Sequence, residues 1–317
     1  MSSSTPRLRL LAGLARRAGQ LLAVTVIVTV LTFAFVHLIP GDPAITILGL
    51  HATPENLAAL RAELGIDRPL IEQFQVYVTT LLQGDLGTSI ATSRPVISMV
   101  VPAFGVTFGI LLAAVVFSTV LGVAAGLTGA LSPAPTVDRT IRIVGMVLLA
   151  TPTFLIGLLL IALFAVRLGV LPAGGWGTPQ SAVLPVLALA GLQAPLVARA
   201  VRASALEVVG QPFVYAAVSR GLGRRRVVLG HILPNSLLPV ITVIGFTVAG
   251  LVGGSAIIEA VFAIPGIGSL LVSAVTARDY PVIQGVTLLT AILVVLINFL
   301  TDVIYAVVDP RTRRVAH

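Results

Sequence analysis

Few residues in this chain of 317 belong to types that catalyse reactions or bind metals, and those few are widely separated. The chain has no cysteine, which excludes disulfides and cysteine-ligated metals. It has no lysine, so it cannot contain the GxxxxGK[ST] loop that holds nucleotide phosphates. Its four histidines stand at positions 37, 51, 231 and 317, and none lies in an HExxH motif. We therefore expect no catalytic residue, no bound cofactor, no metal site and no ATP hydrolysis by this chain.

Polar residues suited to a transport pathway are also few. Gln193, Glu259 and Asn298 lie within or at the end of long apolar stretches and are candidates for a pore or gate. Hydrogen bonding between helices is the alternative role for Gln193 and Asn298. An ion-coupled secondary transporter or channel remains the alternative function, and such carriers hold ionisable groups inside the membrane. The ionisable candidates here, Glu259, Asp302 and Arg167, all fall at the ends of apolar stretches.

The composition is that of a membrane protein. Hydrophobic residues make up 57% of the chain and charged residues 10%, and the mean hydropathy is +1.06. A soluble domain has about 25% charged residues, so much of this surface must face lipid. All twenty basic residues are arginines placed between apolar runs, which favours membrane topology over nucleic-acid binding.

Six apolar stretches are long enough, or nearly so, to cross a bilayer core about 30 Å thick, which requires roughly 20 residues. The fourth is short and contains Pro185 and Pro195, so five spans is the competing count. We expect an all-α integral membrane protein with six transmembrane helices. They are placed at about 21–39, 101–131, 143–166, 182–198, 237–258 and 281–301.

The arginines predict the orientation of these spans. Fifteen of the 20 lie in four segments, 1–20, 132–142, 199–236 and 302–317, which alternate with the spans. Because arginine-rich loops stay in the cytoplasm, both termini, including the tail 309–317, are expected on that side of the inner membrane. The chain then divides into a first part, 1–98, and a main transmembrane part, 99–308.

The segment 40–98 is expected to fold outside the cytoplasm. Thr53 followed by Pro54 is typical of the start of a helix, and Gly65 is suited to end it. A second helix is predicted over 69–83, with apolar residues on one face. This segment either covers the span ends or receives an external partner, and the two roles are compatible.

The cytoplasmic segment 199–236 is the most informative part of the sequence. Pro212 is suited to the first position of a short helix over 213–220, and Gly221 to the left-handed turn that ends it. A second helical stretch begins at Arg224. A short helix with small and apolar side chains can press into a groove on a partner. An ordinary interfacial helix is the alternative.

Residues of this segment resemble the EAA signature of ABC-importer permeases. The signature consists of an alanine pair, here Ala216-Ala217, then a glycine, here Gly221, and a later Leu-Pro, here at 233–234. Tyr215 stands where a glutamate is usual and His231 where an isoleucine is usual, departures similar to the dipeptide/oligopeptide/nickel branch. Segments that resemble the same branch elsewhere are IPGDP at 39–43, GIDRPL at 65–70, GDLG at 84–87, FAIPGIG at 262–268, RDYP at 278–281 and DPR at 309–311.

This resemblance implies the type I ABC-importer permease fold and the first permease of a pair. The implied partners are a second homologous permease, two ATPase subunits that hold ATP and Mg, an extracytoplasmic solute-binding protein and membrane lipids. Short peptides are the expected solutes, with nickel chelates, opines or glutathione-like compounds as alternatives. The helix at 213–220 would couple the permease to the ATPase, with Ala216 and Ala217 at the closest contact. The residues assigned to coupling are Phe213, Tyr215, Ala216, Ala217, Arg220, Gly221 and Arg224.

Overall fold

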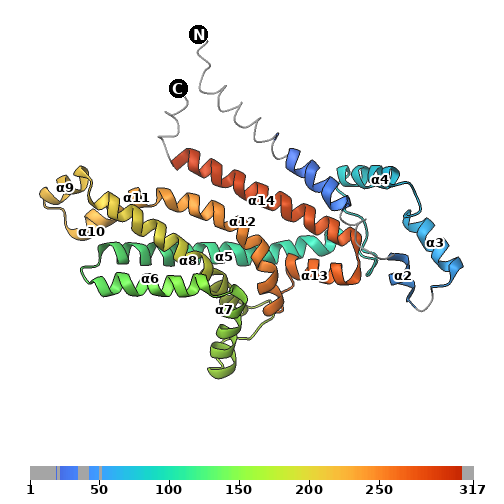
Figure 1. The fold of residues 1–317 in the computed structure, drawn as a ribbon, viewed down its shortest axis with the longest axis horizontal. Helices are drawn as coiled ribbons and strands as arrows, with labels where there is room; N and C mark the ends of the chain where they lie inside the picture. Colours follow the sequence, from blue (N-terminus) through green and yellow to red (C-terminus); the bar gives the residue numbers. More distant parts are fainter. Residues whose placement is uncertain (1–18, 20–21, 35–42, 50–51, 309–317) are drawn as a thin grey trace, which may run out of the picture. The chain divides into compact units, whose positions relative to one another are not determined.

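The structure, a computed structural model, describes residues 19, 22–34, 43–49 and 52–308. Within these ranges the regular elements are helices, with one isolated antiparallel bridge between Thr88 and Pro95. An apolar helix, Leu22–Ala34, precedes the labelled helices (Figure 1). These are α2 (Pro43–Leu48), α3 (Pro54–Leu64), α4 (Leu70–Leu82), α5 (Val96–Leu131), α6 (Pro135–Ala150), α7 (Thr153–Leu160), the π-helix η2 (Ile161–Arg167), α8 (Pro179–Val209), α9 (Pro212–Ser219), α10 (Arg224–Val227), the π-helix η3 (Val228–Ile232), α11 (Leu233–Ser236), α12 (Leu238–Val261), α13 (Ile267–Ala277) and α14 (Tyr280–Val308).

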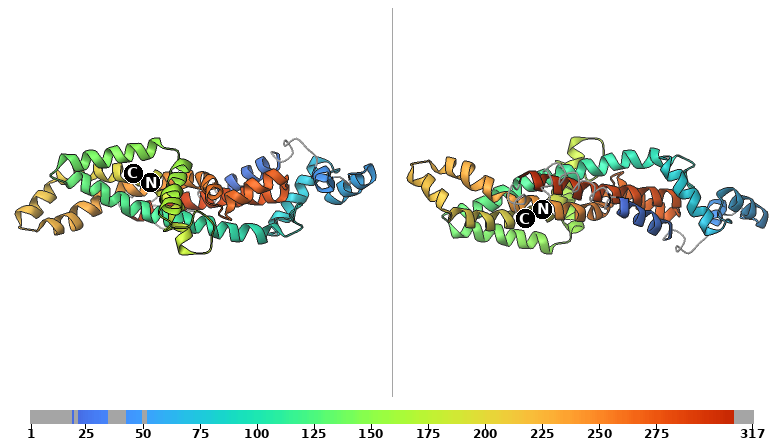
Figure 2. Two further views of the ribbon diagram at one scale, coloured as in Figure 1. Left: turned by 90° about the horizontal axis from the view of Figure 1, so that it is seen from below. Right: turned by 90° about the horizontal axis from the view of Figure 1, so that it is seen from above.

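Two compact units make up the fold. The first comprises Met1–Val106 and Gly266–Val295, and the second comprises Thr107–Pro265 and Leu296–His317. Helix α8 is the centre of the second unit, because it contacts α6, α7, α11 and α12. Helices α6 and α8 run side by side, and α9 lies beyond the end of α8 (Figures 1 and 2).

Helix α8 begins with a capping box and continues well past its expected end. The Thr178 hydroxyl accepts a hydrogen bond from the backbone N–H of Ser181, and Pro179 occupies the first turn. The helix then runs unbroken through Pro185 and Pro195 to Val209. The helix is therefore longer than the span expected at 182–198 and extends into the segment 199–236.

Helices α5 and α8 make close backbone contact within the second unit. Gly122 and Gly126 lie one helical turn apart on α5. A Cβ on Gly122 would lie 2.8 Å from the carbonyl oxygen of Ala194, and one on Gly126 would lie 2.6 Å from that of Ala198. Small residues four apart let membrane helices approach this closely. The pair therefore fixes where α8 crosses α5.

The stretch expected as one helix over 143–166 is broken in the structure. Helix α6 ends at Ala150, and the helical segment 153–167 leaves it at an angle of 105°. Thr151 is extended, with φ −91° and ψ 126°, as expected for a residue before a proline. Pro152 has no N–H to continue the helical ladder, so the helix stops there.

Three helices of the described chain are long and apolar enough to span a membrane, namely α5, α8 and α14. Two bent pairs, α6 with the segment 153–167 and 224–236 with the start of α12, raise that number to five if each pair is one span. The first expected span is described only as the shorter helix Leu22–Ala34. The helical membrane character is thus confirmed, while the count of six stays a prediction.

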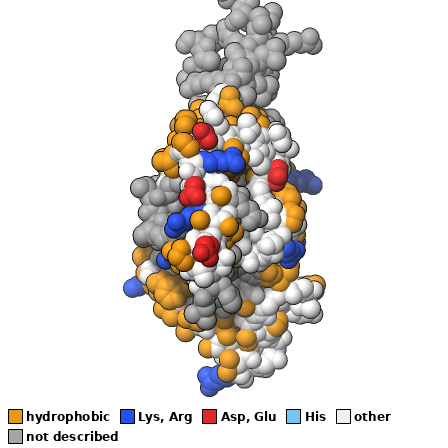
Figure 3. All heavy atoms as spheres, turned by 90° about the vertical axis from the view of Figure 1, so that its right-hand side faces the viewer, with side chains coloured by type: hydrophobic (Ala, Val, Ile, Leu, Met, Phe, Trp, Pro, Cys, Tyr) orange, Lys and Arg blue, Asp and Glu red, His pale blue; other side chains and the backbone are white. Residues whose placement is uncertain are grey.

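The two helices expected in the segment 40–98 are present. Thr53 caps α3 by accepting a hydrogen bond from the N–H of Asn56 at 3.3 Å, and Gly65 ends it with φ 69°. Helix α4 begins at Leu70, within a residue of the expected start. Acidic and arginine side chains are interspersed with apolar ones on the end of the structure that carries α2, α3 and α4 (Figure 3).

Aromatic side chains join α4 to the apolar helix Leu22–Ala34. The Phe33 ring meets Phe74 edge to face, with centroids 5.2 Å apart, and stacks on Tyr77 at 6.0 Å. Burial raises the pKa of Tyr77 to about 12. Leu70 and Leu82 at the two ends of α4 remain largely exposed, so the apolar face of α4 is only partly covered by the described residues.

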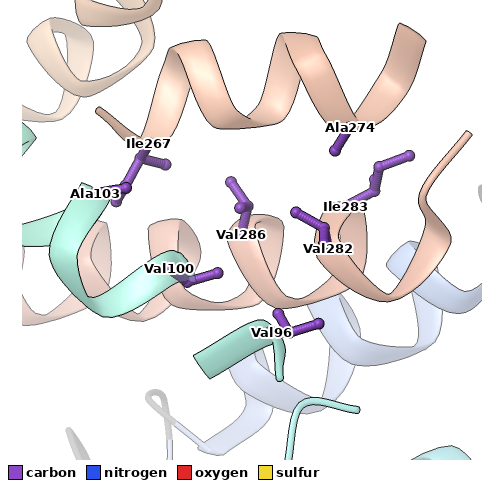
Figure 4. Packing of buried hydrophobic residues seen from close by; sticks show 8 residues of the cluster. All are labelled: Val96, Val100, Ala103, Ile267, Ala274, Val282, Ile283 and Val286. Carbon is purple, nitrogen blue, oxygen red and sulfur yellow. The ribbon is translucent and has the colours of Figure 1, made fainter. Parts of the chain in front are cut away.

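An apolar core in the first unit is formed by the start of α5 with α13 and α14 (Figure 4). Gly285 of α14 lies so close to α5 that a Cβ there would approach Val96 to 2.7 Å. The buried residues of this core are Val96, Val100, Ala103, Ile267, Ala274, Val282, Ile283 and Val286.

Asp279 secures the corner between α13 and α14. Its buried carboxylate accepts hydrogen bonds from the Ser89 hydroxyl and from the Ile90 N–H at 3.1 Å. A buried carboxylate requires such donors, because removal from water without them is costly. Arg278, with φ 55°, makes the sharp turn that brings Asp279 to this position. The loop before α5 is thereby fixed to the corner.

We predict that Gly126→Ala lowers the melting temperature of the purified permease. The added methyl group meets the backbone of α8, and overpacking of this kind costs about 1–3 kcal/mol. Gly109→Ala in the same helix is the matched control, because no atom lies within 4 Å of a Cβ there. The control should match or exceed the wild type, since alanine is favoured over glycine in helices by about 1 kcal/mol. Equal melting temperatures for Gly126→Ala and the wild type would refute the close contact.

Candidate functional site

The short cytoplasmic helix expected at 213–220 is present as α9. Gln211 precedes it in an extended conformation, and Pro212 occupies the first turn. Gly221 follows with φ 78°, and its N–H donates to the carbonyl of Val218 at 2.9 Å. A left-handed turn of this kind favours glycine. The local geometry of the segment is therefore the one expected from its sequence.

One face of α9 packs on its own chain. Val214 and Ala217 are buried and lie in an apolar cluster with Ala205 of α8, Val227 of α10 and Ile232 of η3. Ala217 is therefore covered by its own chain, and the expectation that it lies at the closest contact with an ATPase stays a prediction. Residues three apart share a helix face, so Ala217 follows Val214 into the core.

The other face of α9 is exposed and largely apolar. Phe213 is 43% exposed, Tyr215 63% and Val218 57%. Ala216 and Arg220 are exposed as well. Large apolar side chains gathered on the exposed face of a short helix are typical of a protein-binding surface. We call Phe213, Tyr215, Ala216, Val218 and Arg220 the outer face of α9.

Arg224 has a partner within the chain. Its guanidinium donates a hydrogen bond of 2.7 Å to the backbone carbonyl of Leu131, the last residue of α5. A cation at this end of a helix satisfies a free carbonyl and complements the helix dipole. Arg224 thus ties the segment after α9 to the end of α5.

The candidates for a pore or gate lie in different surroundings. Glu259 of α12 is buried, and the Thr107 hydroxyl of α5 donates to its carboxylate at 2.6 Å. Gln193 of α8 is fully buried, and its amide nitrogen and oxygen have no hydrogen-bond partner among the described residues. Asn298 belongs to α14, but its side chain is outside the described part. A role in the pore stays a prediction for all three.

An ion pair between the first turn of α6 and the C-terminal part of α8 was missed from the sequence. Arg202 of α8 donates two hydrogen bonds to Asp138 of α6, one from each of two guanidinium nitrogens. Arg142 approaches the same carboxylate at 3.2 Å from the next turn of α6. These bonds, chiefly that from Arg202, hold the pKa of Asp138 below its usual range. The sequence gives one indication of this ion pair, because Asp138 is the one acidic residue in the segment 132–142.

No metal centre is evident in the described ranges. They contain no group of three or more histidine or carboxylate residues placed to hold an ion. Three described polar bonds instead join distant parts of the chain, namely Thr107 with Glu259, Arg202 with Asp138, and Arg224 with the backbone of Leu131.

Two family profiles match the chain. The profile described as "Binding-protein-dependent transport system inner membrane component" matches residues 118–314. The profile "Binding-prot-dependent transport system membrane comp, N-term" matches residues 10–121. The chain therefore belongs to the family of inner-membrane components of binding-protein-dependent transport systems.

Known relatives agree with this assignment over almost the whole chain. The "Glutathione transport system permease protein GsiC" of Escherichia coli O6:H1 is 39% identical over 298 residues, which are 94% of this chain and 97% of that protein. The GsiC protein of Salmonella choleraesuis is 40% identical over 302 residues, with the same two shares. This chain is accordingly the permease subunit of an ABC importer, a multi-pass protein of the inner membrane that is not itself an enzyme.

Solved structures support the fold. A chain of the MetNI methionine ABC transporter in an inward-facing conformation matches with a TM-score of 0.57 and 23% identity, over 66% of this chain and 95% of that one. An amino acid ABC transporter matches with a TM-score of 0.51 and 18% identity, over 65% and 92%. At these identities the likeness establishes the ABC-importer permease fold alone. The family itself implies a solute-binding protein and an ATPase as partners.

We predict that Gln193→Leu leaves the melting temperature of the purified complex unchanged or raises it. The substitution removes two buried polar atoms without partners, and each such atom costs about 1–3 kcal/mol. Gln73→Leu is the matched control, because the Gln73 amide donates to the carbonyls of Ile66 and Arg68, and it should lower the melting temperature. A lower melting temperature for Gln193→Leu would show that its amide has a partner in the assembled complex. Loss of uptake without loss of stability would support a role in the pathway.

Proposed function

We propose that this permease forms half of the translocation pathway of an importer for short peptides or peptide-like solutes such as glutathione. A second, homologous permease would supply the other half, and two ATPase subunits would bind ATP and Mg beneath them. The names of the 38–40% identical relatives support the solute class. The absence of lysine from the sequence supports the assignment of all nucleotide binding to the partners.

The proposed topology has six spans and both termini in the cytoplasm. It is supported by the distribution of arginines, 15 of 20 of which fall in the four segments assigned to that side. Helices α5, α8 and α14 and the two bent pairs supply five candidate spans. The stretch around Leu22–Ala34 would supply the sixth.

The outer face of α9 is proposed to dock into a groove on the ATPase. This is the observation on which the coupling role rests: Phe213, Tyr215 and Val218 are exposed, whereas Val214 and Ala217 on the opposite face are held in the chain's own core. Because one face of α9 packs on its own chain, a displacement caused by an ATPase bound to the other face would be passed to the residues on which α9 packs. ATP binding would then bias the permease between two arrangements of its helices.

Reporter fusions test the topology. A fusion after Gln75 should report an extracytoplasmic location, and a fusion at the C-terminus a cytoplasmic one, because arginine-rich segments are retained inside. A phosphatase and a fluorescent reporter, active on opposite sides, give matched readouts at each position. Cytoplasmic reporting from Gln75 would overturn the six-span arrangement.

A second experiment tests coupling and transport in the reconstituted complex. We expect the double variant Phe213→Ala/Tyr215→Ala to weaken ATPase association by at least about tenfold, because buried aromatic anchors contribute more than 1 kcal/mol each at interfaces. Leu206→Ala on α8 is the matched control, an exposed apolar residue outside the outer face. Association is measured by pull-down, and ATP-driven uptake by labelled glutathione and a labelled dipeptide.

Two outcomes would contradict the proposal. If the double variant kept full ATPase association and normal uptake, α9 would be an ordinary interfacial helix. If the permease alone accumulated solute in vesicles under a proton or sodium gradient, the chain would be a secondary transporter.

A further inference from the structure

The ion pair between Asp138 and Arg202 lies where three helices of the second unit meet. Asp138 is in the first turn of α6 and Arg202 is in the C-terminal part of α8. A Cβ on Gly129 of α5 would lie 3.1 Å from the Asp138 Oδ1 and 3.8 Å from the Arg202 Cδ. The pair therefore packs against the backbone of α5 as well as joining α6 to α8.

The same part of α8 carries the surface on which α9 packs. Ala205, three residues after Arg202, is fully buried in the cluster that contains Val214 and Ala217 of α9. Helix α8 then continues to Val209, and only Gly210 and Gln211 separate it from α9. Any displacement of α9 reaches α8 within one turn of Arg202.

Helix α6 lies at the surface of its unit and packs on α8. No residue of α6, the whole of which is described, is buried, whereas α8 has many buried residues. The break at Thr151 separates α6 from the helical segment that follows. The bidentate bond at the first turn of α6 adds a directional contact to this packing.

The two arginines that contact Asp138 differ in whether they connect α6 to another helix. Arg202 binds both carboxylate oxygens, with one bond of 2.9 Å, and its side chain is 30% exposed. Such a bidentate pair fixes orientation as well as distance. Arg142 is 56% exposed and makes an i,i+4 contact within α6, which is weak and links no second helix.

We propose that the Asp138–Arg202 pair is a positioning contact that transmits the movement of α9 to α6 during transport. This role rests on the proposed docking of α9 to the ATPase. When α9 moves, α8 moves with it, and the two parallel hydrogen bonds oblige α6 to follow. Without the pair, ATP hydrolysis would continue but would move α6 less completely, so that less solute is imported for each ATP consumed.

The test compares Arg202→Gln with its matched control Arg142→Gln in the full reconstituted complex with its binding protein. The readout is labelled glutathione or dipeptide imported per ATP hydrolysed, with ATPase pull-down measured in parallel. We expect Arg202→Gln to retain ATPase association and to lower the import ratio about fivefold to tenfold, within the usual range of coupling between linked sites. Arg142→Gln should leave the ratio unchanged. Arg202→Lys should give an intermediate ratio, because lysine keeps the positive charge but cannot form the two parallel hydrogen bonds of a guanidinium group.

Charge reversal separates positioning from a general structural effect. In the Arg142→Gln background, Asp138→Arg and Arg202→Asp should each lower the import ratio, and together they should restore most of it. If the complex with Arg202→Gln fails to assemble, restoration of the import ratio by the reversed pair is the test of the proposal. An unchanged ratio in Arg202→Gln, an equal loss in Arg142→Gln, or no rescue by the reversed pair would each overturn the proposal.

The outcome also distinguishes this inference from the function on which it rests. If Phe213→Ala/Tyr215→Ala loses ATPase association while Arg202→Gln imports normally, the docking of α9 stands and the positioning role fails. If the double variant keeps its ATPase, the docking of α9 fails, whatever the arginine variants show.

Discussion

Helices surrounded by lipid gain little by burying apolar side chains against each other, because the lipid tails are equally apolar. The permease must therefore be held together by close backbone contact and by polar bonds between helices. The crossing of α5 and α8 at Gly122 and Gly126 is the clearest case of the first kind. It sets the position of α8, and α8 in turn carries the contacts to α6, α7, α11 and α12.

Polar bonds add directional contacts between parts of the chain. Glu259 bonds Thr107 between α12 and α5, and Asp138 bonds Arg202 between α6 and α8. In the first unit, Asp279 holds the loop that precedes α5. Each is a carboxylate with a partner on a distant part of the chain. Paired groups of this kind fix both the distance and the orientation of the parts they join.

The sequence predicted those features that depend on neighbouring residues. Caps, prolines and left-handed glycines act within a few positions, so α3, α4 and α9 were located to within about two residues. The partner of Asp138 could not be found in this way, because Arg202 is 64 positions away and nothing local links them. Burial of the Ala217 side chain depends on which face of α9 packs against α8 and η3. The spacing groups Ala217 with Val214 but does not say which face is buried.

Helix α8 has 31 residues and is about 46 Å long at a rise of about 1.5 Å per residue, whereas the bilayer core measures about 30 Å. In the proposed topology its last turns therefore lie outside the bilayer core, on the side where α9 follows in the chain. Each residue rotates a helix by about 100°. A residue gained or lost between 206 and 209 would turn the start of α9 by about that angle relative to Ala205, on which α9 packs. In the proposed docking, the direction in which α9 faces the ATPase is thus set by helical phase, and a flexible linker would carry no such restriction.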